Sequence, residues 1–214
     1  MIRVLKRFSL FVFLLNSQAI AGENKAGDFD YYVLALSWNA SWCAEAGDDR
    51  GADQCHPKHD HGFLVHGLWP QYEDGWPSYC RTTYRDPSRR QTKAMSDVMG
   101  SGGSAWHQWK KHGRCSGISS DRYFDLVREA YAKIERPSIL RKVDKTLRID
   151  PTVIEEAYLQ SNNAMKASGI TVTCKQGRIQ EVRICLTKDL QFRSCGRDVS
   201  RDCTLSGAIF PPMR

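Results

Sequence analysis

Histidines are the residues of this chain best suited to proton transfer, and all six fall in two segments. The unperturbed pKa of histidine, about 6.5, lets the side chain accept and donate protons near neutral pH. One such group acting as base and another as acid, with a cation between them, can carry out general acid–base catalysis. Chemistry of this kind is therefore expected at residues 56–70 and 106–115.

The second segment is predicted to form a helix over residues 106–112. At about 100° per residue, its two tryptophans point away from the polar side chains and can bury against a core. Two imidazoles, an ammonium and an amide then lie together, and all of them can hydrogen-bond a phosphate. A helix with a polar face and no catalytic role fits the same pattern. The shared face holds His107, Gln108, Lys111 and His112.

The first segment joins a histidine-rich loop to a histidine in an apolar strand. Residues 56–61, His-Pro-Lys-His-Asp-His, could in principle ligate a metal. Their spacing matches no closed tetrahedral pattern, so we interpret them as a polar loop and expect no metal. His66 lies in a predicted strand over residues 63–68, just before Gly67. Alternation puts it on the side opposite Val65, together with Leu68.

Both strands and helices are expected to position these groups. Strands are expected over residues 28–38, 63–68, 169–174 and 178–186, with a third short tail strand near Phe192. On the first of them Tyr32, Leu34, Leu36 and Trp38 share one face, as in a half-buried strand. Apolar spacing and end signals indicate helices from Ser120 to about 134 and from Asp150 to Ser161. Because helices and strands do not strictly alternate, the pattern favours an α+β fold with a central antiparallel sheet.

The composition is that of a folded protein, with 26% charged and 41% hydrophobic residues, which excludes disordered and fibrous classes. Three cations precede the apolar run 8–15, and Ala19-Ile20-Ala21 follows, so residues 1–21 are predicted to be a signal peptide. The apolar run is shorter than the ~20 residues that a transmembrane anchor needs. We expect a secreted or periplasmic protein with one domain over residues 22–214, whose formal net charge falls from +7 to +4.

Eight cysteines are present, and none of them forms a Cys-x-x-Cys pair. This argues against a zinc ribbon and for disulfides in an oxidising compartment. Spacing alone leaves the pairing open.

Two segments resemble the active-site segments of the ribonuclease T2 family, which are secreted ribonucleases that cut RNA without a metal. They are His66-Gly67-Leu68-Trp69-Pro70 and Trp109-Lys110-Lys111-His112-Gly113-Arg114-Cys115. The similarity extends to the strand ending at Trp38, to the helix opening at Asp121 and to the C-terminal cysteines. It implies an α+β fold with a central antiparallel sheet and several helices. It also implies an endoribonuclease of little base selectivity, without cofactor or stable membrane association, and we expect a monomer.

In this family the ribose 2′-hydroxyl attacks its own phosphate and leaves a 2′,3′-cyclic phosphate, a route closed to DNA. The resemblance implies a catalytic set of His112 as base, His66 as acid, Lys111 as stabiliser of the pentavalent phosphate, and Gln108. His107 would hold the phosphate. Trp69 would stack on a base, although a core indole is the other interpretation.

Gln108 departs from the family, which usually has glutamate at this place. An amide donates a hydrogen bond to phosphate but lends no negative charge to an imidazolium, so reduced activity is expected. Two alternatives stay open: a catalytically weak or inactive RNA-binding relative, and a metal-dependent phosphodiesterase that uses the loop over residues 56–61.

The resemblance also suggests how the cysteines pair. It implies bridges between Cys80 and Cys115, Cys174 and Cys203, and Cys185 and Cys195, which leaves Cys43 with Cys55. The first bridge would tie the two active-site segments together.

Overall fold

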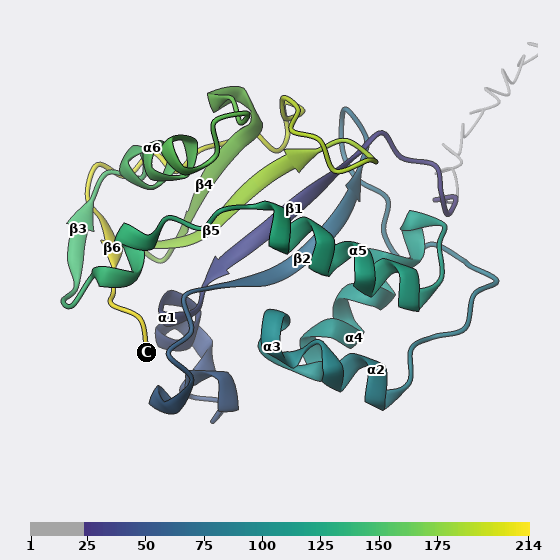
Figure 1. Cartoon of the computed structure of the whole chain (residues 1–214), viewed down its shortest axis with the longest axis horizontal. Coiled ribbons are helices and arrows are strands. Elements are labelled where there is room, and N and C mark those ends of the chain that lie inside the picture. Colours follow the sequence, from purple (N-terminus) through teal and green to yellow (C-terminus); the bar gives the residue numbers. More distant parts are fainter. Residues whose placement is uncertain (1–23) are drawn as a thin grey trace, which may run out of the picture.

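The computed structural model describes residues 24–214, so the predicted signal peptide, residues 1–21, lies outside the described residues. Figure 1 shows a twisted sheet with helices packed against it. The six strands are β1 (Tyr31–Trp38), β2 (Phe63–Gln71), β3 (Leu147–Ile149), β4 (Ile170–Lys175), β5 (Arg178–Leu186) and β6 (Ala208–Phe210). Their order is β2-β1-β5-β6-β3, with β4 paired to β5. All pairings are antiparallel except β5 with β6, so the predicted α+β class is confirmed.

Six α-helices occur in the described residues, and they gather in separate groups (Figure 1). The helices Ser96–Met99, Gly102–Lys111 and Ser120–Lys133 lie against β2, and the helix Thr152–Ser161 packs on β4. The helices are α1 (Asn39–Trp42), α2 (Arg89–Ala94), α3 (Ser96–Met99), α4 (Gly102–Lys111), α5 (Ser120–Lys133) and α6 (Thr152–Ser161). Short helical turns cover Cys43–Gly47, Asp53–Cys55, Pro57–His59, Gly113–Ser116, Ser138–Lys142 and Ala167–Gly169.

The main core lies between the sheet and helices α5 and α6. The predicted shared face of β1 is confirmed, because Tyr32, Leu34, Leu36 and Trp38 all belong to this core. The opposite face is not solvated as expected. A second cluster of Tyr31, Val33, Cys185 and Val199 covers part of it, so β1 is buried on both sides.

The predicted tail strands are β4 and β5, joined by a two-residue turn. Both central residues, Gln176 and Gly177, have positive φ, as in a type I′ hairpin turn. The predicted strand near Phe192 is wrong, because Phe192 makes only an isolated bridge to Leu186. Helix α6 starts later than predicted, and Asp150 accepts a hydrogen bond from the Thr152 backbone N–H at its entrance.

Four disulfides lie within the described residues, and each predicted pair is confirmed: Cys43–Cys55, Cys80–Cys115, Cys174–Cys203 and Cys185–Cys195. Between residues 24 and 214, none of the helices combines the length and apolar character needed to cross a membrane.

Candidate active site

A bulge in β2 presents His66. In the β1–β2 ladder Ala35 pairs with Gly67 and Leu36 pairs with Val65, so His66 is the extra residue of the bulge. A bulged residue leaves the alternation of its strand and re-aims its side chain. His66 is accordingly exposed within a buried strand, with 44% of its side chain accessible. The predicted grouping of His66 with Leu68 is therefore wrong, because after the bulge Leu68 joins Val65 in the main core.

Helix α4 carries the second group of polar side chains and ends one residue earlier than predicted. Ser101 caps its start, where the side-chain Oγ accepts the Ser104 backbone N–H at 3.0 Å. Trp109 is fully buried, and its Nε1 donates to Asp86 at 2.8 Å. Trp106 is only partly buried, against expectation. His112 follows the last helical residue and is 5% exposed.

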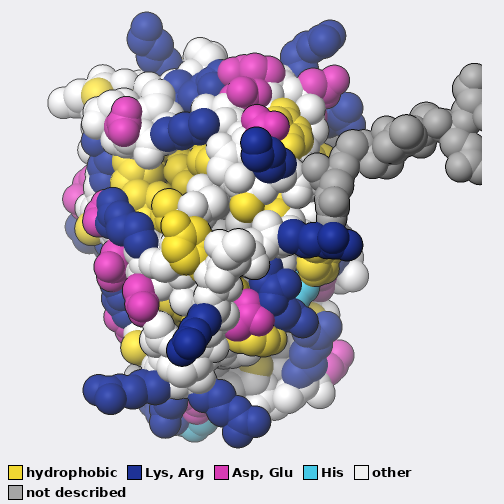
Figure 2. Space-filling model, turned by 90° about the vertical axis from the view of Figure 1, so that its right-hand side faces the viewer, with side chains coloured by type: hydrophobic (Ala, Val, Ile, Leu, Met, Phe, Trp, Pro, Cys, Tyr) yellow, Lys and Arg dark blue, Asp and Glu magenta, His cyan; other side chains and the backbone are white. Residues whose placement is uncertain are grey.

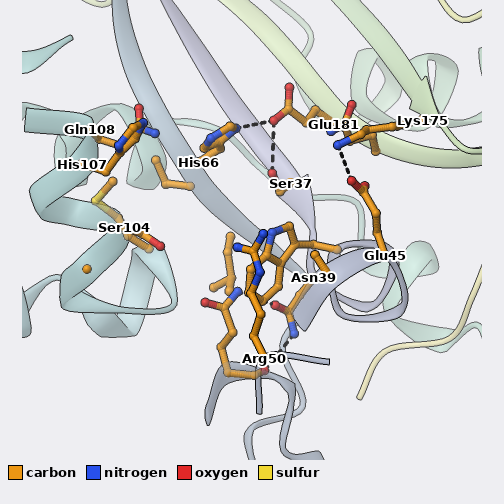
Figure 3. A pocket seen from close by; sticks show the side chains of 18 residues that line it. Ser37, Asn39, Glu45, Arg50, His66, Ser104, His107, Gln108, Lys175 and Glu181 are labelled. Carbon is orange, nitrogen blue, oxygen red and sulfur yellow. Dashed lines mark hydrogen bonds and ion pairs between the residues drawn. The ribbon is translucent and has the colours of Figure 1, made fainter. Parts of the chain in front are cut away.

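The structure brings all the predicted site residues to one cavity of about 300 Å³. Strand β2 supplies the first two, and α4 with its C-terminal cap supplies the rest. A second cavity of about 420 Å³ adjoins it and shares His66, His107 and Gln108. Figure 3 shows this second cavity, with the three shared residues labelled. The site residues that line the first cavity are His66, Trp69, His107, Gln108, Lys111 and His112.

Trp69 lies between the two histidines that were assigned as acid and base. Its ring stacks on His112, with centroids 5.2 Å apart, and meets His66 edge-on at 5.2 Å. Its Nε1 donates to Gln108 Oε1 at 2.8 Å. Gly67 is required next to this bond, because a Cβ there would collide with both Trp69 Nε1 and Gln108 Oε1. Trp69 thus lines the cavity and does not belong to the main core.

His112 is buried among positive charges. Burial lowers its pKa to about 3, with further lowering from Lys111, His66 and His107. Burial and Lys111 lower the pKa of His107 in the same way. Within the described chain, Nδ1 of His112 has no hydrogen-bond partner. The buried ring is therefore neutral near pH 7 and able to accept a proton.

Strand β5 contributes two residues that the sequence analysis did not single out. Glu181 accepts a hydrogen bond from His66 Nδ1, and its other oxygen binds Arg183 at 3.0 Å. Arg183 also lines the smaller cavity, with its guanidinium 5.5 Å from the Trp69 ring. The available signal was a carboxylate and a guanidinium two residues apart in a predicted strand, which places them on one face.

The histidine-rich loop lies outside both cavities. His59 binds Asp53 at 3.0 Å and stacks on His61 with ring centroids 5.1 Å apart. Over residues 24–214, a group of three converging metal-ligating side chains forms only at Cys43, Asp48 and Cys55. The two sulfurs of that group are bonded to each other. In the described residues, the histidine-rich loop therefore does not bring three such side chains together.

The fold is shared with solved structures that are named as a ribonuclease or as a ribonuclease-related protein. The chain superimposes on an RNase-related protein from Calystegia sepium with a TM-score of 0.67 and 23% identity, over 86% of this chain and 97% of that one. It superimposes on RNase NT in complex with 5′-AMP with a TM-score of 0.60 and 22% identity, over 87% and 100% of the two chains. At this identity the likeness establishes the fold alone.

Curated relatives show a closer likeness in sequence. A ribonuclease of Aeromonas hydrophila is 41% identical over 124 residues, which are 58% of this chain and 55% of that protein. Extracellular ribonuclease LE of Solanum lycopersicum is 32% identical over 185 residues, 75% of this chain and 74% of that protein. The matched part spans about half the length of the Aeromonas relative and of ribonuclease 3 of Arabidopsis thaliana. The family model for the ribonuclease T2 family matches residues 29–195, and on this match the chain belongs to that family.

Proposed function

We propose that this protein is an endoribonuclease that cleaves single-stranded RNA by attack of the ribose 2′-hydroxyl on the adjacent phosphate. The observation that supports this most strongly is the convergence of His66, Lys111 and His112 on one cavity of about 300 Å³. A base, an acid and a cation around one phosphate are what this reaction needs, and no metal enters it.

His112 acts as the base in this proposal. Its buried ring, with a pKa lowered to about 3, is neutral at pH 7 and accepts the proton of the 2′-hydroxyl. An anionic phosphate in the cavity offsets the positive charge of Lys111, which makes the ring a stronger base when substrate is bound. The 2′-oxygen bonds to phosphorus, and the 5′-oxygen leaves with a proton from His66. A 2′,3′-cyclic phosphate and a free 5′-hydroxyl result, and water can open the cycle with the two roles exchanged.

The remaining residues bind and orient. Lys111 stabilises the charge that develops on the phosphoryl oxygens, and His107 holds the phosphate. Gln108 fixes the Trp69 indole through its oxygen. The indole is placed to stack on a base, which is worth roughly 1–3 kcal/mol per base.

Surface charge fits a modest attraction to RNA. The formal net charge is +7 for the whole chain and +4 without residues 1–21. Figure 2 shows Lys and Arg side chains spread widely over one face, with Asp and Glu among them. A distributed charge of this kind attracts a polyanion without a single binding stripe. Selectivity for RNA over DNA then comes from the reaction, which needs the 2′-hydroxyl.

The four disulfides support action outside the cytosol, in a secreted or periplasmic protein that has lost residues 1–21. Sequencing the N-terminus of the exported protein tests the cleavage after Ala21. Action as a monomer stays a prediction, which gel filtration with light scattering would check.

A catalytically weak RNA-binding protein is the second candidate. It is favoured by the amide at position 108 and by the missing hydrogen-bond partner of His112 Nδ1 within residues 24–214. Such a protein would bind RNA in a salt-dependent way and release no cyclic phosphate.

The test is incubation of the purified protein with RNA, with DNA of the same sequence, and with EDTA. RNA cleavage should survive EDTA, and DNA should stay intact. His66→Ala and His112→Ala should each lose at least ~10² in rate. His59→Ala, which alters the loop outside the cavities, serves as the control and should leave the rate unchanged. Loss of activity in EDTA, or a wild-type rate in either active-site variant, would refute the proposal.

A further inference from the structure

A carboxylate lies on the opposite side of His66 from His107 and Gln108, as Figure 3 shows. Glu181 is 2% exposed, in the middle of strand β5. Its Oε1 accepts hydrogen bonds from His66 Nδ1 and, at 3.3 Å, from Ser37 Oγ. Its Oε2 accepts two from Arg183, at 3.1 and 3.0 Å. Figure 3 shows the line from His66 through Glu181 to Ser37.

We propose that Glu181 is a positioning residue for His66, which holds the imidazole in the orientation and protonation state of the general acid. The inference rests on the proposed function and deepens it. With Nδ1–H bound to the carboxylate, the transferable proton is on Nε2, across the ring. That nitrogen can deliver it to the departing 5′-oxygen of the substrate.

The contacts around His66 leave the ring little freedom. The β2 bulge turns its side chain out of the core, and Glu181 binds one nitrogen. The rings of His66 and Trp69 meet edge-on, with their centroids 5.2 Å apart. Ser37 and Glu181 are direct partners across the β1–β5 ladder, so the carboxylate is anchored by backbone pairing as well as by side chains. An acid held this way needs no reorganisation at the moment of proton transfer.

A buried carboxylate is costly unless it is paired, and Glu181 is paired with His66 and Arg183. Burial raises the pKa of Glu181, but the hydrogen bond and charge of His66 and the Arg183 guanidinium outweigh burial and lower the pKa to about 2. Glu181 is therefore ionised near neutral pH. The acceptor for His66 Nδ1–H is present there in its charged form.

Other charged groups around His66 are mostly positive. Strand β5 contributes Arg183 next to Glu181, and helix α4 contributes Lys111, while the imidazoles of His107 and His112 have lowered pKa values. Across the larger cavity Lys175 of β4 is paired with Glu45. Among these groups, Glu181 is the carboxylate in direct contact with His66.

The first experiment compares Glu181→Gln with the wild type on two substrates. One is a dinucleotide, whose 5′-oxygen must be protonated as it leaves. The other is a nucleoside 3′-(p-nitrophenyl phosphate), whose leaving group departs as a stable anion and needs no acid. A positioning role predicts a loss of roughly 10–100-fold in kcat on the dinucleotide, as for other partners that orient an active group. The activated ester should lose much less, and KM should change little for either substrate.

The pH profile gives a readout that a merely structural role would not change. The basic limb of kcat/KM on the dinucleotide should move to lower pH in Glu181→Gln, because an opposite charge next to the acid has been removed. Glu129→Gln is the control, since it removes the charge of an arginine-paired glutamate of α5 outside both cavities. Equal losses on the two substrates, or a limb that does not move, would overturn the inference.

Two further measurements test the contact, and the first of them needs no Glu181 variant. Nitrogen NMR of the wild-type imidazoles should show the proton of neutral His66 on Nδ1, and a proton on Nε2 would contradict the proposal. In a His66→Ala background, Glu181→Gln should cause no further loss on the dinucleotide, and an additional loss of 10-fold would contradict it. A wild type that cleaves neither substrate would instead overturn the proposed function, while the NMR result would still decide the hydrogen bond.

Discussion

Replacing Gln108 by glutamate adds a carboxylate one helical turn before His112. Gln108 is 3% exposed, and its Oε1 accepts the Trp69 Nε1–H at 2.8 Å. The His112 ring stacks on the same indole. Glutamate has the same length as glutamine, so one carboxylate oxygen keeps the bond from Trp69. The substitution therefore changes charge near the imidazole with little change in shape.

The size of the effect follows from the surroundings of His112. Burial, Lys111, His66 and His107 lower its pKa to about 3. Residues four apart on a helix have Cβ atoms about 5–6 Å apart, and an opposite charge at that range raises a pKa by roughly 1–3 units. The acid limb of kcat/KM should move from near pH 3 to between about pH 4 and 6. A stronger base also assists the attack of the 2′-hydroxyl, so the plateau rate should rise.

Steady-state kinetics on a dinucleotide, from below the acid limb to pH 8, measure both effects. Gln160→Glu is the matched control, because it adds the same charge on an exposed position of α6. Thermal unfolding of both variants shows whether the buried substitution alters the fold. An unshifted limb with a lower rate would refute this reasoning. It would mean that the site uses the amide of Gln108 itself, as a donor to the phosphate.

Three other predictions concern stability and binding. Replacing both Cys80 and Cys115 by serine should reduce activity and lower the free energy of unfolding by about 4 kcal/mol, which is the chain-entropy value for a sequence separation of 35 residues. Calorimetry and kinetics check this, and an unchanged Tm would contradict it. Burial, with Asp202 adding to it, raises the pKa of Glu155 from 4.5 to about 7 in the folded state. Folding therefore loses stability as pH rises through this range, and Glu155→Gln should gain Tm relative to wild type between pH 5 and 8 rather than keep a constant difference. Trp69→Ala should raise KM for a dinucleotide by the equivalent of roughly 1–3 kcal/mol, and an unchanged KM would leave the indole without a role in stacking.

Much of the fold could be predicted because its signals are local. The amphipathic spacing from Ser120 onward marks α5, and the turn at Gln176 and Gly177 separates β4 from β5. Strands β3 and β6, of three residues each, were missed, because their pairing depends on chain segments far apart in sequence. The bulge at His66 was missed for the same reason, since a bulge is a property of two strands in register rather than of one.

The candidate site was predictable where residue types are distinctive. The histidines and Lys111 stand in two short segments, and the structure brings them to one cavity. Glu181 and Arg183 were not found, because a charged pair in an otherwise apolar strand resembles a solvated strand face until the neighbouring strand is known. The burial of His112, which sets its low pKa, likewise comes from packing that no single segment reveals.

The central claim is that this site cleaves RNA through the 2′-hydroxyl, with histidines and without a metal. Phosphorus NMR of a dinucleotide incubated with the purified protein in EDTA tests it most directly. The account predicts that the 2′,3′-cyclic phosphate appears first and that a 3′-phosphate follows from it. A first product with a linear phosphate, or no product until a divalent metal is added, would contradict it.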